Sequence, residues 1–433
     1  LVTVEAGGFL SGNESRTWGE SVMTDASGNM IYSYRSWGKN GPSRVRDFNG
    51  SVNYQHSTAR DGETLTLSYR VSTGRNVSVS ETEYTEMDDA PMDYTGIDAD
   101  SRVRSMEHTV QADWSRPTGA NGAIDAGGKY IYRDNRNMTT RAYAGSHTDF
   151  SDFGHSTHIG AVFADYRLNV GRFGARAGVR YEYSHLSARF PDGSAPSFGS
   201  DLHDVVPNVS VMLKANGRNT IKLSAGSRIQ RPGIFYLNPA VDITPDKTSE
   251  GNPGLKSVRQ NNVNVNYSFI GARLSVNADA GYYFADNEIV AVERTDGDHI
   301  YSSYANAGRR RHAHGGVYAR WSVSGSTSIV LSTSADHVTV NNPDNGDCSA
   351  GWGYSVFGSL SQKLPGKMLF MAAAGWKRKT PELYTRRMPS GMSDFMWGLR
   401  LRRTMLKDDR LTVGLEIVNP IRVRHPRSIV ESW

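Results

Sequence analysis

The chain has 433 residues, a formal net charge of +5, 38% hydrophobic residues and a single cysteine, Cys348. This composition excludes a disordered chain, and the lone cysteine excludes a disulfide scaffold, a cysteine-rich zinc site and an iron–sulfur cluster. The 44 acidic residues are interspersed among 49 basic ones, so no nucleic-acid partner is expected, and no run of sequence is long and apolar enough for a membrane-spanning helix.

Apolar and polar residues alternate with a period of two along most of the chain, which predicts β-strands with one apolar face. In the first clear run Leu65 and Leu67 share one face, and Thr64 and Thr66 share the other. The clearest runs, in chain order, are residues 63–71, 173–184, 262–269, 274–284 and 411–417. About seventeen strands can be assigned in this way, and no helix is convincing.

Two features favour a membrane barrel over a soluble β-sandwich. The runs keep their alternation for about ten to thirteen residues, whereas soluble strands average about five or six and a bilayer needs about ten tilted residues. Short and long connections also alternate, which is typical of outer-membrane barrels with periplasmic turns and extracellular loops. The short turns centre on residues 59–62, 118–121, 170–171, 215–218, 270–271, 323–325, 363–366 and 406–409. The long stretches are 86–100, 134–156, 188–202, 231–256, 286–309, 339–349 and 379–392.

Five aromatic residues on the predicted apolar face lie within a few residues of the short turns: Trp114, Phe173, Phe269, Trp321 and Phe370. This position is typical of an aromatic girdle at the periplasmic interface. The alternative is that they are ordinary core aromatics near strand ends.

The polar halves of the alternating runs are predicted to face the barrel lumen, because a charge at the lipid-facing midplane costs about 2–4 kcal/mol. Besides Thr64 and Thr66, the predicted lumen-facing residues are Arg176, Arg180, Glu182, Asn262, Asn264 and Asn266.

Three motifs follow one another across a single long loop between two strands. They are Arg228-Ile229-Gln230-Arg231-Pro232, then Leu237-Asn238-Pro239, then Gly251-Asn252-Pro253-Gly254-Leu255-Lys256. In this order they make residues 206–269 resemble the TonB-dependent-receptor-like outer-membrane β-barrel family. The family usually continues the last motif with Pro-Glu, where this chain has Ser257-Val258.

The resemblance implies a large all-β antiparallel barrel of about 22 strands, with an N-terminal plug domain inside it and a segment that binds TonB. Neither is visible in the sequence, so residues 1–433 are expected to be part of the barrel domain. The plug and the first strands are expected upstream of Leu1, and a closing strand downstream of Trp433. A gap is then expected between the strand near Leu1 and the strand ending near Val418; the alternative is that these two strands pair and close a smaller pore.

The motif residues are predicted to shape the backbone of a loop that braces barrel and plug, since Pro, Asn-Pro and Gly-Asn-Pro favour turns. These residues are Arg228, Arg231, Pro232, Asn238, Pro239, Gly251, Asn252, Pro253 and Leu255. The alternative is that the loop contacts a transported ligand. Residues 231–256 are expected to be the best ordered of the long loops and to lean into the barrel mouth, because the prolines lower the entropy of ordering.

Three charged or metal-ligating groups offer weaker hypotheses. His312 and His314 have a spacing that puts both imidazoles on one face of a strand, which suits a metal site; no third ligand is near in sequence, so a solvated or lumen-facing pair is favoured. The run Arg309–Arg311 could contact lipopolysaccharide phosphates, although a solvated charge run is favoured. Acidic residues in 81–89 could bind calcium, although a solubilising loop is favoured.

These features predict the barrel portion of a TonB-dependent receptor in the outer membrane of a Gram-negative bacterium, which takes up a scarce or bulky nutrient by energy coupling. The alternative is a passive porin-like or adhesin-type barrel, with a soluble glycan-binding protein third. No phosphate-binding loop, nucleophile elbow or zinc-protease motif is present, so neither an enzyme nor a cofactor is expected. The expected partners are membrane lipid, lipopolysaccharide, the plug, TonB, and a small-molecule, glycan or peptide ligand.

Overall fold

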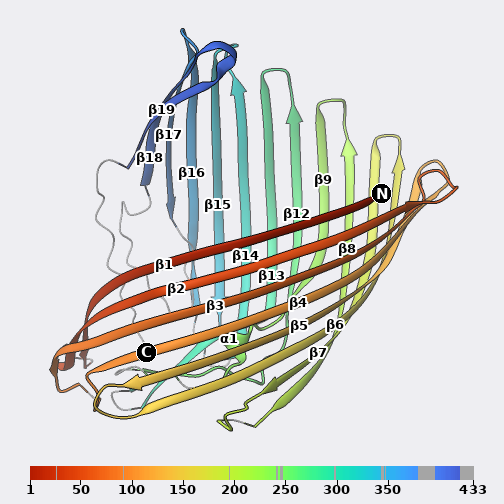
Figure 1. Ribbon diagram of the computed structural model, residues 1–433. Coiled ribbons are helices and arrows are strands. Elements are labelled where there is room, and N and C mark those ends of the chain that lie inside the picture. Colours follow the sequence, from red (N-terminus) through yellow and green to blue (C-terminus); the bar gives the residue numbers. More distant parts are fainter. Residues whose placement is uncertain are drawn as a thin grey trace.

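The computed structural model describes the chain except for residues 26, 91, 195, 240–241, 244–246, 297–298, 343–345, 347, 379–394 and 420–433. The described residues form one curled antiparallel sheet in which seventeen long strands pair with their neighbours in chain order (Figure 1). The first nine are β1 Val2–Thr24, β2 Met30–Ser57, β3 Thr64–Asp88, β4 Gly96–Thr118, β5 Gly122–Tyr143, β6 Thr148–Val170, β7 Phe173–Arg189, β8 Phe198–Lys214 and β9 Asn219–Gln230. The other eight are β12 Val258–Ile270, β13 Leu274–Asp296, β14 His299–Ser322, β15 Thr327–Asn341, β16 Cys348–Leu364, β17 Met368–Arg378, β18 Phe395–Met405 and β19 Leu411–Val418. The all-β prediction and its strand number are confirmed.

All eight predicted short turns fall between consecutive strands, at one end of the sheet. Gly119 and Gly171 have positive φ values of 74° and 58° in two of these turns, a conformation that glycine adopts without a steric penalty. The opposite end carries the long connections. We call these the short-turn end and the long-loop end.

Several stretches predicted as long loops are wrong in their extent, because strands continue into them. β4 begins within 86–100, β5 and β6 occupy most of 134–156, and the β13–β14 ladder continues to the pair Asp296–His299. The reason is that backbone pairing continues beyond the level at which one face must be apolar. There the alternation that would reveal the ladder disappears while the ladder itself persists: the end of β5 is mostly polar on both faces, and β13 has register shifts followed by the apolar run Ile289–Val292.

The sheet has an apolar face and a polar face, and cross-strand pairing keeps each face uniform. Val265 is paired with Leu223 and Ala280, whereas its neighbour Asn264 is paired with Ser224 and Gly281. Apolar-face side chains such as Val179 are open to the outside, at 48% exposed, whereas the carboxylates of Asp165 and Glu182 on the polar face are crowded by their neighbours and are 8% and 13% exposed. Crowding of this kind indicates that the polar face is the concave one.

The sequence-predicted polar residues all lie on this polar face, opposite the exposed valines, leucines and tyrosines of the same strands. They are Thr64, Thr66, Arg176, Arg180, Glu182, Asn262, Asn264 and Asn266. That the polar face borders a lumen stays a prediction, and it is developed under the proposed function.

Two bands of rings lie on the apolar face. The five predicted aromatics form the band near the short turns, where Phe173 is 59% and Trp321 is 49% exposed. A second band, nearer the long-loop end, was not predicted and consists of tyrosine–histidine pairs on neighbouring strands. The hydroxyls of Tyr69, Tyr130 and Tyr181 lie 2.9, 2.7 and 2.7 Å from the Nδ1 atoms of His108, His158 and His203. Two such bands are typical of a protein that crosses a hydrocarbon layer, with one band at the interface on each side.

The two outer strands of the sheet are each paired on one side only. Among the described residues β1 pairs with β2, β19 pairs with β18, and no ladder joins β1 to β19, so the sheet is not closed. The alternative of a small closed pore is therefore not seen in this part of the chain. Strands upstream of Leu1 and downstream of Trp433 stay predictions. None of the helices in the described ranges is long or apolar enough to cross a membrane.

A matched pair of substitutions on β12 tests which face meets lipid. Val265→Arg places a charge on the apolar face and should lower the free energy of unfolding in a bilayer by about 2–4 kcal/mol. Asn266→Arg places the same charge on the polar face, where water can solvate it, and should cost less than half as much. Equilibrium urea unfolding in lipid vesicles measures both, and equal costs for the two variants would contradict the assignment of faces.

Candidate functional site

The segment after β9, residues 231–256, lies on the polar face at the long-loop end in its described parts, 231–239, 242–243 and 247–256. It contains α1 Ile234–Leu237 and the short strands β10 Asp242–Ile243 and β11 Lys247–Ser249. β10 and β11 pair with each other, and β11 also pairs in parallel with β14. β11 therefore extends the sheet along the edge of β14 that lies beyond its ladder with β15, so the segment stays attached to the sheet. Its order relative to the other long loops stays a prediction.

A small apolar core holds this segment against two distant parts of the sheet. Leu237 is 1% exposed and Leu255 is 5% exposed, and both pack with Leu186 of β7. Tyr236 packs edge-on against Tyr304 of β14, with ring centroids 4.8 Å apart. Since β7 and β14 are separated by four long strands, these contacts bridge the concave face.

The backbone within the segment is pinned where the second and third motifs meet. The Gly251 amide donates to the Asn238 carbonyl at 2.8 Å, and the Asn252 amide donates to the Tyr236 carbonyl at 2.6 Å. A Cβ atom on Gly251 would lie 2.4 Å from the Asn238 carbonyl oxygen, so this approach requires glycine. This contact explains why the motifs contain Asn238 and Gly251.

The third motif also binds the loop to β14. The Asn252 side-chain amide donates to the Tyr304 carbonyl at 2.8 Å, and its side-chain oxygen accepts from the Gly254 amide at 2.8 Å. Asn306 of β14 bonds both backbone groups of Lys256, at 2.7 and 3.0 Å. The motif's polar side chains are thus used on backbone groups, which favours a bracing role over ligand contact.

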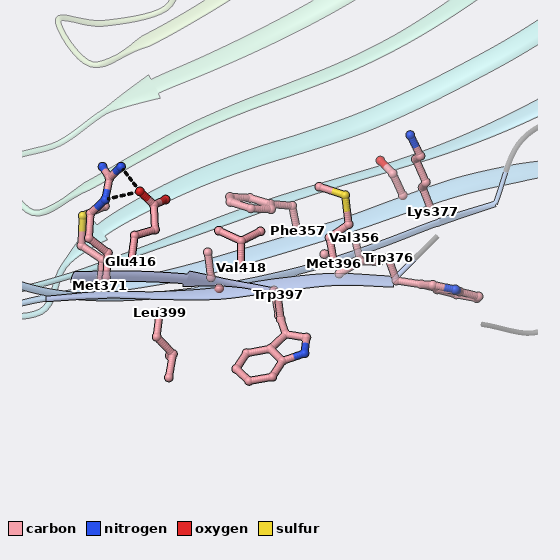
Figure 2. Close-up of a pocket in the computed structure, with 16 residues that line it drawn as sticks. Val356, Phe357, Met371, Trp376, Lys377, Met396, Trp397, Leu399, Glu416 and Val418 are labelled. Carbon is pink, nitrogen blue, oxygen red and sulfur yellow. Dashed lines mark hydrogen bonds and ion pairs between the residues drawn. The ribbon is translucent and has the colours of Figure 1, made fainter. Parts of the chain in front are cut away.

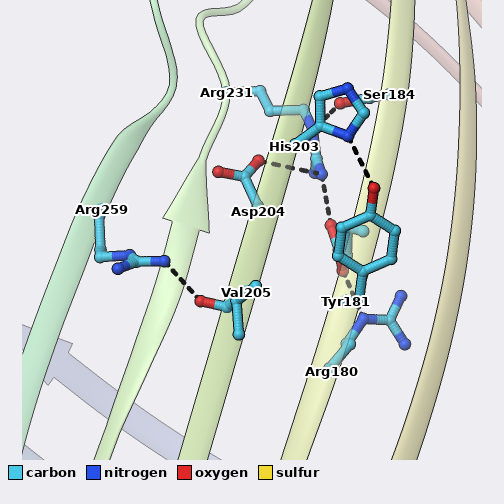
Figure 3. A network of polar contacts seen from close by, with 9 residues as sticks. Arg180, Tyr181, Ser184, His203, Asp204, Val205, Arg231 and Arg259 are labelled. Atoms are coloured by element: carbon cyan, nitrogen blue, oxygen red, sulfur yellow. Dashed lines mark hydrogen bonds and ion pairs between the residues drawn. The ribbon is translucent and has the colours of Figure 1, made fainter.

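Arg231 anchors the start of the segment in a charged network on the polar face (Figure 3). Its guanidinium forms an ion pair with Glu182 of β7, and its Nε donates to the Ser184 hydroxyl at 3.2 Å. Glu182 also pairs with Arg180, and Asp204 of β8 lies 4.0 Å from Arg231. The Glu182 side chain is only 13% exposed, so its charge is compensated by the two flanking guanidinium groups.

Arg228 and Gln230 of the first motif lie at the end of β9 and form a second set of polar contacts, with β12. Arg228 donates to the Gln260 side chain of β12 at 3.2 Å, and Gln260 donates in turn to Gln230. Pro232 is buried two residues after Gln230, the last ladder residue, and it cannot continue the ladder because it has no amide donor. Pro239 and Pro253 are half-buried within the segment.

The polar face beside this network is lined by further ion pairs between neighbouring strands. They are Arg133–Glu107 at 2.5 Å, Arg167–Asp125 at 2.6 Å and Arg176–Asp165 at 3.1 Å. Such a surface can bind polar or charged groups through its side chains.

The sequence profile of the outer membrane protein beta-barrel family matches residues 56–432. The chain belongs to this family. Membership places the protein in the outer membrane of a Gram-negative bacterium. No curated protein sequence matches the chain.

The fold of this outer-membrane barrel protein is similar to that of three solved proteins. The copper transporter OprC has a TM-score of 0.59 at 11% identity, covering 95% of this chain and 72% of OprC. The siderophore receptor PiuA from Acinetobacter baumannii has a TM-score of 0.59 at 11% identity, covering 89% of this chain and 66% of PiuA. The ferric-catecholate import receptor Fiu from Escherichia coli K12 has a TM-score of 0.55 at 10% identity, covering 97% of this chain and 77% of Fiu. The resemblance to TonB-dependent-receptor-like barrels is confirmed at the level of the fold.

The other sequence-predicted groups of this outer-membrane barrel protein lie on strands. In the run Arg309–Arg311, Arg310 pairs with Glu288 at 3.2 Å and Arg311 pairs with Asp286 at 2.5 Å, so acidic residues of β13 already compensate two of the three charges. The predicted acidic loop is wrong in one respect: through Asp88 its residues belong to β3, and Glu86 pairs with Arg35 of β2 at 2.5 Å.

The loop that joins β7 to β8 lies at the long-loop end, and Asp192 anchors it. Its carboxylate accepts from the Asp152 amide at 2.7 Å, and from the Ser194 amide and hydroxyl at 3.0 and 2.8 Å. Burial alone would raise the pKa of Asp192, but these hydrogen bonds outweigh it and lower the pKa below its usual range. At neutral pH these bonds therefore hold the β7–β8 loop in place. They are lost only as the pH falls below the ordinary carboxyl pKa.

An apolar hollow of about 410 Å³ lies where β16–β19 end (Figure 2). Its lining includes Phe357, Met396 and Val418, with the Arg400–Glu416 ion pair at one side. Residues 379–394 and 420–433 adjoin it in sequence and lie outside the described chain, so it is not assigned as a binding site.

Removing the Arg231 anchor should loosen the start of the segment without unfolding the sheet. Arg231→Ala deletes a charge-assisted bond to Glu182, and such bonds contribute about 1.5–3 kcal/mol. Amides of α1 and β11 should then exchange with deuterium at least about ten-fold faster, as measured by hydrogen-exchange mass spectrometry. Arg218→Ala, in a short turn at the opposite end, is the matched control and should leave these amides unchanged. Unchanged exchange in Arg231→Ala would show that the network does not hold the segment.

Proposed function

We propose that this chain is the barrel portion of a TonB-dependent outer-membrane receptor that takes up a scarce or bulky nutrient by energy coupling. The observation that carries the proposal is the segment 231–256 braced across the concave polar face by Arg231 and by the Leu237–Leu255 core. A barrel wall that fixes a folded segment over the concave face, at the long-loop end, suits a receptor with a gated lumen. It suits an open pore less well.

The width of the sheet supports this proposal. Barrels of eight strands are filled by side chains, those of 16–18 strands leave a water-filled channel, and those of about 22 strands hold a plug. The seventeen long strands of the described residues do not close into a barrel, so they fit the largest of these barrel classes. In this proposal the polar face, with Arg176, Arg180 and Glu182, borders the lumen and the plug, while the apolar face meets lipid and lipopolysaccharide.

The polar wall supports a hydrated or chelated ligand over an apolar one. Its ion pairs join neighbouring strands, and the arginine side chains of Arg133 and Arg176 stay 42% and 50% exposed. The solved proteins with this fold are named as a copper transporter, a siderophore receptor and a ferric-catecholate receptor. For this chain we propose the broader class of nutrients that are too scarce or too bulky for passive diffusion.

Uptake by strains that differ only in energy coupling tests the proposal. Cells lacking the gene should lose growth on one scarce nutrient, and cells that keep the gene but lack TonB should lose it to the same extent. Growth that persists without TonB would identify a passive porin-like barrel instead. A growth defect that appears on every nutrient in the gene deletion would indicate damage to the membrane, and would also contradict the proposal.

A further inference from the structure

The polar face of β13–β15 carries a cluster of metal-ligating side chains outside the braced segment. His312 and His314 lie on β14, and Asp336 of β15 is the direct cross-strand partner of His314. The Asp336 Oδ1 atom lies 2.8 Å from His312 Nε2 and 2.7 Å from His314 Nδ1. The third ligand that is absent near the histidines in sequence is thus supplied by the neighbouring strand.

A second carboxylate holds the other side of the His314 ring. Asp279 of β13 lies 3.0 Å from His314 Nε2, so this imidazole is placed between two carboxylates. A neutral imidazole has only one N–H, so it cannot donate to both carboxylates. If Nε2 donates to Asp279, the Nδ1 lone pair faces an Asp336 oxygen, and that contact is favourable only with a proton or a metal ion between them.

This arrangement has the connectivity of a metal-bound histidine with its supporting carboxylate. Histidines that bind metals usually donate their other ring N–H to a carboxylate, which fixes the tautomer and the ring orientation. Here Asp279 has that position, and Gly316 leaves room for it, because a Cβ on Gly316 would lie 3.1 Å from an Asp279 oxygen.

The distances and exposure suit an ion of first-row transition-metal size. The candidate ligand atoms of His312, His314 and Asp336 all lie within 4.8 Å of one another. Ligands at about 2.0–2.2 Å from one ion are themselves separated by roughly 3–4 Å, so shifts of about an ångström would suffice. The three side chains are 32%, 38% and 23% exposed, which leaves an open side for water or a further ligand.

We propose that His312, His314 and Asp336 form a binding site for a divalent first-row transition metal ion, with Asp279 orienting His314. Two imidazole nitrogens and one carboxylate favour Zn²⁺, Ni²⁺ or Cu²⁺ over Ca²⁺ and Mg²⁺, which prefer oxygen ligands. The site does not depend on transport or on TonB. Its test is therefore independent of the test of the proposed function.

Copper titration of the protein extracted from outer membranes in detergent tests the site. Cu²⁺ should bind at one equivalent per chain, with an electron paramagnetic resonance spectrum showing coupling to two nitrogens, and millimolar Ca²⁺ should not displace it. His312→Gln should reduce the coupling to one nitrogen. His312→Gln, His314→Gln and Asp336→Asn should each weaken the affinity at least about ten-fold, and Asp279→Asn should weaken it about 10–100-fold as a supporting residue.

Controls on the other face separate this site from general copper binding. His203→Gln removes a histidine of the apolar face and should change the affinity by less than about two-fold. Unchanged circular dichroism identifies the variants that keep the sheet, and the three ligand positions give three independent tests. Equal Cu²⁺ affinity in the parent protein and in every folded ligand variant would overturn the proposal and leave a protonated His314 as the group between the two carboxylates.

Discussion

The structure depends on one constraint: every strand must satisfy its backbone hydrogen bonds through its neighbours while presenting apolar side chains on one face only. In hydrocarbon an unpaired amide or carbonyl costs several kcal/mol, so strands can cross only as members of a continuous ladder. The ladder fixes which residues are cross-strand neighbours, and it therefore keeps valines beside leucines on one face and asparagines beside serines on the other. This constraint places the polar side chains on the concave face. The ion pairs, the contacts of the braced segment and the histidine cluster are all formed by side chains of that face.

The braced segment shows how a loop can become part of the wall. Its motifs are rich in glycine, proline and asparagine because each shapes or satisfies backbone: Gly251 permits a close approach, Pro232 ends a strand, and Asn252 bonds a carbonyl of β14. Arg231 adds the single strong electrostatic contact, with Glu182 two strands away. A segment held by backbone contacts at one end and by a charge pair at the other is a stable surface against which other parts of a receptor can pack.

Sequence reasoning was most successful where the physical signal is local. The short turns, the apolar and polar faces and the aromatic band near the short turns all follow from alternation and turn residues within a few positions of each other. It failed for the parts of the strands near the long-loop end, where the alternation of apolar and polar residues is lost and the ladder leaves no periodic signal, as in β5 and β13. It also missed the tyrosine–histidine band, because a pair such as Tyr69 and His108 is 39 positions apart and is recognisable only once the register is known.

By itself, the sequence determined an all-β outer-membrane fold, the positions of about seventeen strands and those of the motif residues, because strand periodicity and turn chemistry are properties of short stretches. Only the tertiary structure decided what those residues contact. The partners of Arg231 and His314 are 49 and 22 positions away, and they meet them through cross-strand register and the curl of the sheet. Register is set by hydrogen bonding over whole strands, and shifting it by one residue would move each side chain to the other face.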